Sequence, residues 1–367
     1  MSLQTPKPVM DTADMLALLR TQWDPQACAV RHLSGERDLN FLVELQGSDQ
    51  RYVLKVSDTA ENPASLALQN ATMEYLACQA DTAGGASEMA RVTANADLQL
   101  RVQRIHRWRD GSHMLCLPDA DGVRYARVLG YLPGRPLHEA PASAAQRHAI
   151  GWVLGRLDRA LQGFAHPVVT NDALFWDIHR TGELQSWLPS IADPQSRAWG
   201  EQVFAAYLQQ VEPLLAQLPQ QFLHNDFNPY NLLVDPSNPD RVCGVLDFGD
   251  MVYGPRVFDA AVGASYQAHT SCQPRLDSLL EFMRGYQQAN PLTAPELQWL
   301  PLLAAVRCAI TLAITERRAQ WFPENRSYIL RNHGVASAGL RAIMEPGLAH
   351  STARLLDALP GAAQGTP

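Results

Sequence analysis

The chain contains very little lysine. Of its 30 lysine and arginine residues only Lys7 and Lys55 are lysines, and the other 28 are arginines. Charged residues make up 18% of the 367 residues, the formal net charge is −7, and no long block of one sign occurs. This composition argues against a nucleic-acid partner, which requires clustered positive charge. The acidic balance suits a cationic small molecule, although many soluble proteins share it.

Cysteine spacings typical of metal or redox sites are also missing. The six cysteines are scattered, without a C-x-x-C pair, and several lie in apolar runs: Cys28, Cys78, Cys116, Cys243, Cys272 and Cys308. We therefore expect small buried side chains in a reducing compartment. The first twenty residues hold no apolar signal core, and no run approaches the roughly 20 apolar residues of a membrane span. These absences predict a soluble, cytoplasmic protein with no membrane partner.

Short strand-like runs dominate the first third of the chain. Apolar spacing predicts helices over 11–22 and 63–79. Alternating and β-branched runs separated by turn residues predict strands at 27–33, 41–45, 51–57, 98–108, 113–117 and 124–132. This part therefore predicts a small antiparallel sheet with one helix, in a lobe spanning residues 1–132.

Helical spacing dominates after Pro133 and Gly134. Helices are predicted at 142–161, 191–218, 256–269, 275–289, 296–320 and 337–358. A single hairpin, between Asp226 and Asp247, interrupts them. The sequence thus predicts an α+β protein of two lobes, the second mainly helical and spanning residues 133–367.

The hairpin carries the most specific chemical signal. Asp226 and Asn231 precede and open one apolar run, and Asp247 ends the next, so the turn between them brings all three to one edge. Phosphoryl transfer needs a carboxylate that accepts a hydroxyl proton and oxygen ligands that hold Mg²⁺ on nucleotide phosphates. Asp226 is the predicted base, and Asn231 and Asp247 are the predicted Mg²⁺ ligands. His224 is expected to orient the loop in a structural role.

Lys55 lies inside an apolar strand pattern, where a compact ammonium can reach the phosphates of a nucleotide. The alternative is an edge-strand lysine whose ammonium extends to water. Glu74 is the only acid inside the following helix and is predicted to hold Lys55 in an ion pair. A solvated helix face is the alternative for Glu74.

Two backbone segments are predicted to contact the nucleotide. The turn that begins with Ser34 and Gly35 can present N–H groups to phosphates, although an ordinary β-turn would look the same. The strand ending at Gly130, Tyr131 and Leu132 can offer peptide groups to a purine edge.

Together these motifs resemble the aminoglycoside phosphotransferase and choline kinase superfamily. The resemblance rests on the His224-to-Asn231 loop, on Asp247 to Asp250, and on Lys55 with Glu74, and it spans roughly residues 15–345. Segments 35–41, 127–134 and 246–262 look most similar to hydroxylysine kinase and its bacterial relatives. The H-R-D-L and A-P-E segments of protein kinases are absent. The resemblance implies a bilobal protein-kinase-like fold that transfers the γ-phosphoryl of ATP or GTP to a hydroxyl of an amino acid or amino alcohol.

The acceptor site is less well defined by the sequence. Asp250 and Tyr253 follow the predicted metal ligand and are expected to face the acceptor, whereas the resemblance implies that Asp259 braces the loop. Arg307 lies in a long apolar helix, where an unpaired cation is costly to bury. We predict that Arg307 binds an acceptor carboxylate, and the alternative is an internal ion pair with a helix acid.

Other acceptors fit the same motifs. Homoserine, choline, ethanolamine and aminoglycosides all present a hydroxyl beside an amine. A different class is a pseudokinase-like module that senses a nucleotide or metabolite without chemistry. The intact set of Lys55, Asp226, Asn231 and Asp247 favours an enzyme.

Overall fold

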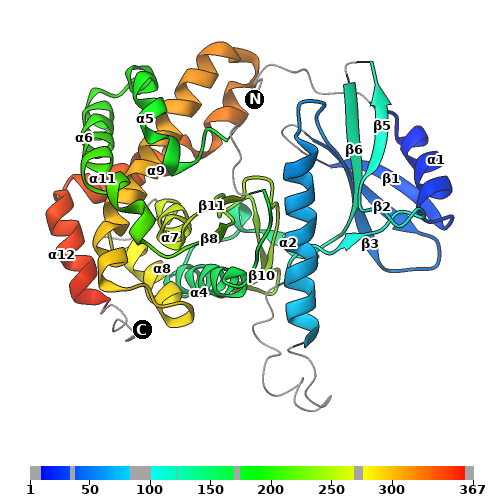
Figure 1. Cartoon of the computed structure of the whole chain (residues 1–367), viewed down its shortest axis with the longest axis horizontal. Coiled ribbons are helices and arrows are strands. Elements are labelled where there is room, and N and C mark those ends of the chain that lie inside the picture. The colour runs from blue at the N-terminus through cyan, green and yellow to red at the C-terminus, as the bar shows by residue number, and fades with distance from the viewer. Residues whose placement is uncertain are drawn as a thin grey trace. The chain divides into compact units, whose positions relative to one another are not determined.

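The computed structural model describes residues 10–33, 38–82, 101–120, 122–168, 174–267 and 276–359. The chain divides into two compact units, which Figure 1 colours along the sequence. The first, here the sheet unit, comprises Met1–Pro133, His166–Val168 and Gly244–Gly249. The second, the helical unit, comprises Gly134–Ala165, Val169–Cys243 and Asp250–Pro367.

The sheet unit is built on an antiparallel sheet of six described strands in the order β1-β2-β3-β6-β4, with β5 also paired to β6. Its strands are β1 (Ala27–Leu33), β2 (Leu39–Leu45), β3 (Arg51–Val56), β4 (Ile105–His106), β5 (Leu115–Asp119) and β6 (Gly122–Gly130). Helices α1 (Thr12–Gln22) and α2 (Pro63–Thr82) belong to the same unit.

Alternating apolar residues hold this sheet to α1. Phe41, Leu54 and Val128 project from neighbouring strands into a buried cluster that also contains Leu19 of α1. Trp108 closes the cluster, and its buried indole N–H donates to the Ala126 carbonyl at 3.1 Å. Strand β3 therefore lies at the centre of a well-packed sheet, between β2 and β6.

The helical unit contains most of the helices. They are α4 (Ala144–Leu161), α5 (Thr181–Leu184), α6 (Pro194–Gln210), α7 (Arg256–Ser265), α8 (Leu276–Ala289), α9 (Ala294–Trp321), α10 (Arg326–Ile329), α11 (His333–Met344) and α12 (Leu348–Ala358). Two small sheets accompany them, one of β10-β9-β7 and one of β11-β8. Their strands are β7 (Arg135–Pro136), β8 (Gln220–Leu223), β9 (Leu232–Asp235), β10 (Asn238–Val245) and β11 (Val252–Pro255).

Glycines allow α4 and α8 to pack unusually closely. A Cβ added at Gly151 would lie 1.8 Å from the Phe282 carbonyl oxygen, and one at Gly285 would lie 1.9 Å from the His148 carbonyl oxygen. Both positions therefore exclude any side chain. The close crossing brings the C-terminal halves of these helices together at Asp158 and Tyr286.

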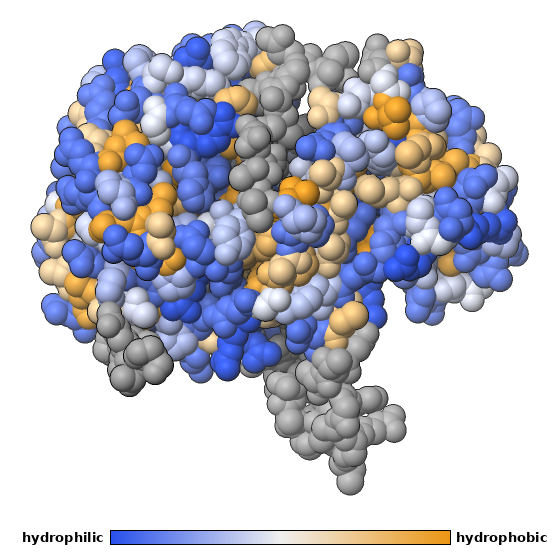
Figure 2. All heavy atoms as spheres, in the orientation of Figure 1, coloured by the Kyte–Doolittle hydropathy of each residue, from blue (hydrophilic) through white to orange (hydrophobic). Residues whose placement is uncertain are grey.

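Helix α9 forms the centre of the helical unit. It is long and apolar enough to cross a membrane, which the sequence analysis did not predict, but 89% of its apolar window is buried inside the protein. Such burial is typical of a core helix. Large exposed apolar side chains are few among the described residues, and Figure 2 shows apolar residues in patches among hydrophilic ones.

The structure confirms the predicted α+β fold class and corrects several boundaries. The helix predicted over 191–218 ends at Gln210 and continues as a 3-10 turn over Glu212–Gln217. The helix predicted over 337–358 is two helices, because the chain breaks at Pro346 and at Gly347, whose φ is +93°. Residues 98–100 of one predicted strand lie outside the described residues, and β4 is much shorter than that prediction.

The cysteine prediction is partly wrong. Cys308 is buried as expected and Cys243 is half-buried, but Cys28, Cys78 and Cys116 are exposed. None of these five forms a disulfide bond with another described cysteine, and Cys272 lies outside the described residues. A cysteine within an apolar run can still be exposed, because its position in the strand or helix period determines whether it faces the core or the solvent.

Candidate active site

Lys55 occupies the central strand β3 of the sheet unit. Its Nζ lies 3.2 Å from Asp38 Oδ2 and 3.3 Å from Asp247 Oδ1, and its side chain is only 14% exposed. Asp38 reaches Lys55 because β2 begins one residue later and pairs Asn40 with Lys55 across the hairpin. Burial alone would lower the pKa of Lys55, but the carboxylates of Asp247 and Asp38 raise that pKa above its ordinary value. The ammonium is therefore held charged and in place.

The expected Lys55–Glu74 bridge is wrong. Glu74 Oε1 instead pairs with Arg107 Nη2 at 2.9 Å and with His113 Nε2 at 3.0 Å. The orientation of α2 explains the difference, because the helix turns Glu74 toward a partly exposed face. The loop before β2 supplies the counter-ion through Asp38, a residue that the sequence analysis missed.

The buried face of α2 carries amides rather than carboxylates. Gln69 Oε1 and Asn70 Oδ1 accept from Arg127 Nη1 at 2.9 and 3.2 Å. Arg127 is fully buried on β6, directly opposite Lys55 in the sheet. Among the described side chains of α2 none pairs with Lys55, whose described acidic partners are Asp38 and Asp247.

Asp38 pairs with Lys55 and Glu74 does not, so substitutions of these two acids should have different effects on the reaction. We expect Asp38→Asn to lower kcat/KM for the nucleotide by about 10-fold, because the lysine loses a charged partner that fixes its position. Glu74→Gln is the matched control and is expected to change kcat/KM by less than about two-fold, since surface ion pairs contribute little. Steady-state kinetics with varied nucleotide measures both, and equal losses in the two variants would contradict the assignment.

Asp247 lies in the short segment Gly244–Gly249, which belongs to the sheet unit although it is distant from the rest of that unit in sequence. Val245 forms a parallel bridge with Val102, and its N–H donates to the Arg101 carbonyl at 2.9 Å. Asp247 has a φ of +59°, an uncommon conformation for a residue other than glycine, and its Oδ1 accepts from the Gly249 N–H at 3.0 Å. A Cβ at Gly249 would come within 2.9 Å of that oxygen. The turn thus holds an exposed carboxylate beside Lys55 at some cost in backbone strain.

The backbone groups proposed for the purine have different surroundings. The Gly130 N–H donates to the Arg104 carbonyl at 2.8 Å, and its carbonyl accepts from Gln103 Nε2 at 3.3 Å. The Tyr131 N–H donates to the Arg51 carbonyl. Gly130 is therefore already used inside the sheet unit, whereas no hydrogen bond is described for the Leu132 peptide. Ser34 and Gly35 lie outside the described residues.

In the helical unit, hydrogen bonds to the Asp259 carboxylate hold the backbone of the loop from His224 to Asn231. Asp259 accepts from the His224 N–H at 2.7 Å through Oδ2 and from the Asn225 N–H at 2.8 Å through Oδ1. Asn225 has a φ of +62°, and its side chain donates to the Asp250 carbonyl at 3.1 Å. The Asp226 N–H donates to the buried His224 ring at Nδ1. Asp259 and His224 thus hold the loop backbone.

Amides and one arginine fix the Asp226 carboxylate. Its Oδ2 accepts from Asn228 Nδ2 at 2.8 Å and from Asn231 Nδ2 at 2.7 Å. Its Oδ1 lies 3.7 Å from Arg307 Nη2. Asn228, which the sequence analysis missed, follows Asp226 by two residues in the H-x-D-x-N pattern. The carboxylate therefore stays oriented without losing its role as an acceptor.

Arg307 is 1% exposed and lies in α9. Its Nη1 donates to the Trp176 carbonyl, its Nη2 lies 3.5 Å from the Tyr266 hydroxyl oxygen, and its Nε has no described partner. Burial alone would lower the pKa of Arg307, but Tyr266 and Asp226 raise it. An internal ion pair exists, as the alternative proposed, although its acid is Asp226 of the loop rather than a helix acid.

The remaining predicted acceptor residues differ in exposure. Asp250 lies near enough to contribute to the raised pKa of Arg307, after Tyr266 and Asp226. Tyr253 is exposed on β11, and its ring packs edge-on against Phe222 at 5.2 Å. Tyr266 and Trp176, which touch Arg307, were not predicted, because their positions depend on the packing of α7 and α9.

The predicted cation ligands are consistent with a hard metal ion. Asn231 directs both described hydrogen bonds of its amide nitrogen to Asp226, so the amide oxygen is the group left for a ligand. Asp247 presents an exposed carboxylate. Within the described ranges no cluster of three His, Cys, Asp or Glu residues could hold a metal. Magnesium commonly takes one or two protein oxygens and completes its shell with phosphates and water.

A charged strand lysine beside an aspartate, and a braced H-x-D-x₄-N loop, define a phosphotransferase of the protein-kinase-like fold. The sequence comparison agrees. The model of the phosphotransferase enzyme family matches residues 29–299, and the chain belongs to this family. It is thus a phosphotransferase with a hydroxyl acceptor, as the sequence predicted.

Relatives and solved structures share most of the chain. Hydroxylysine kinase of Mus musculus is 28% identical over 343 residues, which cover 88% of this chain and 86% of that protein. The structure of a microcompartment-associated aminopropanol kinase matches with a TM-score of 0.67 and 21% identity, covering 94% of this chain and 100% of that one. Amicoumacin kinase matches with a TM-score of 0.60 and 15% identity, covering 89% and 93%. The two structures show a shared fold.

Proposed function

We propose that the protein transfers the γ-phosphoryl group of ATP or GTP to a hydroxyl of a small amino acid or amino alcohol, with hydroxylysine as the leading acceptor. The observation that carries this proposal is the Asp226 carboxylate, oriented by Asn228, Asn231 and Arg307. The similarity to hydroxylysine kinases over nearly the whole chain supports the acceptor class. We also propose a cytoplasmic location and the lobe boundary near residue 132.

Each residue has a proposed role. Asp226 orients the acceptor hydroxyl and takes its proton as the hydroxyl oxygen bonds to the γ-phosphorus. The bond from that phosphorus to the β–γ bridging oxygen breaks, and the nucleoside diphosphate leaves with the bonding electrons. Lys55 binds nucleotide phosphates, and the Leu132 peptide contacts the base. Asn231 and Asp247 would hold Mg²⁺, which supplies positive charge to the phosphates when bound. His224 and Asp259 hold the loop that carries Asp226.

A panel of acceptors tests the function. Purified protein is incubated with ATP or GTP, Mg²⁺ and one hydroxy-amine at a time. A coupled assay measures the release of ADP or GDP. We expect hydroxylysine to give the highest kcat/KM among hydroxylysine, homoserine, ethanolamine, choline and an aminoglycoside. Homoserine is the second candidate, because a homoserine kinase of Rhizobium meliloti is 26% identical over 206 residues. Turnover with none of them would contradict the proposal and favour a nucleotide or metabolite sensor.

Arg307 is proposed to contact the acceptor carboxylate as well as Asp226. Its charge is buried and its Nε has no described partner, so an incoming carboxylate would complete its contacts. We expect Arg307→Met to raise the KM for hydroxylysine by about 10- to 100-fold. The control acceptor is an amino alcohol without a carboxylate, for which KM should change little. An equal fall in kcat for both acceptors would show that Arg307 acts only through its ion pair with Asp226 and does not contact the acceptor carboxylate.

A further inference from the structure

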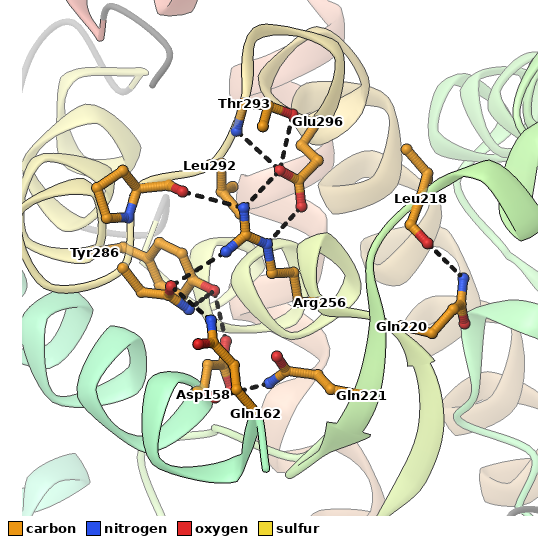
Figure 3. A network of polar contacts seen from close by, with 12 residues as sticks. Asp158, Gln162, Leu218, Gln220, Gln221, Arg256, Tyr286, Leu292, Thr293 and Glu296 are labelled. Carbon is orange, nitrogen blue, oxygen red and sulfur yellow. Dashed lines mark hydrogen bonds and ion pairs between the residues drawn. The ribbon is translucent and has the colours of Figure 1, made fainter. Parts of the chain in front are cut away.

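A second carboxylate is buried beneath the His224–Asn231 loop. Asp158 of α4 and Tyr286 of α8 are both fully buried, and the Tyr286 hydroxyl donates to Asp158 Oδ2 at 2.6 Å. Figure 3 shows this contact within a network contributed by several helices. The glycines of the α4–α8 crossing permit the approach, and Gln221 Nε2 fixes the Asp158 carbonyl at 2.9 Å.

The arginine whose charge acts on Asp158 is already paired with another acid. Arg256 forms a two-pronged ion pair with the fully buried Glu296, Nε to Oε1 at 2.7 Å and Nη2 to Oε2 at 2.8 Å (Figure 3). Its Nη1 donates to Asn290 Oδ1 at 3.2 Å. Glu296 also accepts from Thr293 at the start of α9. Arg256 therefore offers little charge to a second acid.

Asp259 is the neighbour that matters most. Both of its oxygens accept N–H groups from the loop, at His224 and Asn225, and the residue is fully buried. Among the interactions of the Asp158 carboxyl are the negative charge of Asp259 and a side-chain hydrogen bond with it, and both raise the pKa of Asp158. Burial and the negative charge of Asp259 raise the pKa of Asp158 well above its ordinary value. Two ionised carboxylates at this depth would repel each other without a compensating cation.

We propose that Asp158 carries a proton in the folded protein and donates it in a hydrogen bond to Asp259, which fixes the loop that bears Asp226. Asp158 Oδ2 accepts from Tyr286, and the buried Oδ1, which accepts no described hydrogen bond, carries the proton. Asp158 is thus a positioning residue that acts through Asp259. Loss of the proton would set two anions side by side and push Asp259 away from the peptide N–H groups that it holds.

The pH dependence follows from the groups that face Asp158. These are Tyr286 of α8, Asp259 and Arg256 of α7, and, through Arg256, Glu296 of α9. Burial raises the pKa of Tyr286 well above its ordinary value, so its hydroxyl remains a donor. An acid with a raised folded-state pKa contributes stability that is fully present below its unfolded pKa, about 3.9. That contribution is lost as pH rises through the folded-state pKa.

The first experiment measures stability and needs no activity. The free energy of unfolding of the full chain and of Asp158→Asn is determined by denaturant titration between about pH 5 and 9. Asparagine keeps the shape, donates to Asp259 and accepts from Tyr286, but cannot ionise. We expect the unmodified chain to lose stability relative to Asp158→Asn as pH rises, and Tyr286→Phe to keep that slope. Parallel curves, or an Asp158→Asn protein that does not fold, would overturn the proposal.

The second experiment rests on the proposed kinase function. We expect Asp158→Asn to keep kcat within about two-fold at neutral pH and to retain it at alkaline pH where the unmodified chain loses it. Asp158→Ala removes the donor and should lower kcat by about 10-fold with little change in either KM. An Asp158→Asn loss as large as that of Asp158→Ala would overturn the proposal. If no acceptor is turned over, the proposed function fails, and the stability curves still decide the protonation of Asp158.

Discussion

Asp226→Asn is expected to lower kcat by about 10²- to 10⁴-fold, the range that a positioned proton acceptor contributes. Asparagine keeps the size of the side chain and can still accept from Asn228 and Asn231, which hold the carboxylate at 2.8 and 2.7 Å. The variant should therefore fold normally and bind nucleotide, while the amide cannot take the hydroxyl proton. Steady-state kinetics with saturating nucleotide and acceptor measures the loss.

A matched control is available in the neighbouring hairpin. Asp235→Asn makes the same chemical change at the end of β9, where the carboxylate accepts from Ser237 within a turn. This variant should retain kcat within about two-fold. Similar activity of Asp226→Asn and the unmodified chain would remove Asp226 from the reaction.

Asp247→Asn is expected to lower kcat/KM by at least about 100-fold and to raise the Mg²⁺ concentration needed for half-maximal rate. The substitution removes a charged oxygen ligand and a partner of Lys55, 3.3 Å away. Asparagine tolerates the positive φ of this position better than alanine does, so the backbone turn should survive. Initial rates over a series of Mg²⁺ concentrations measure the effect.

Stability provides the control for Asp247. The side chain is about half exposed, so the free energy of unfolding should change by less than about 1 kcal/mol. A large loss of stability would indicate that the lower rate reflects damage to the turn. An unchanged Mg²⁺ requirement would show that Asp247 does not hold the cation.

Local sequence patterns predicted the parts of this molecule that depend on short segments. The sheet around Lys55 and the hairpin between Asp226 and Asp247 follow from alternating apolar residues and turn residues, which act over a few positions. The fold class was also predictable, because strands precede helices along the chain. These features need no knowledge of how distant elements pack.

Contacts between distant elements were not predictable in the same way. The partner of Lys55 depends on the β2–β3 register and on the rotation of α2, which turns Gln69 and Asn70 inward and Glu74 outward. The Asp226–Arg307 ion pair and the Asp158–Tyr286 hydrogen bond join residues that are 81 and 128 positions apart. Helix packing decides both, and no pattern within one helix reveals it.

The near absence of lysine gives the Lys55 site a practical property. Amine-selective reagents have only two side chains to modify in the whole chain, Lys7 and Lys55. Lys55 is shielded between Asp38 and Asp247, so its acylation should be slow and should slow further when a ligand covers it. Peptide mass spectrometry can therefore follow occupancy at this one lysine as a footprint, with no engineered label and independently of turnover.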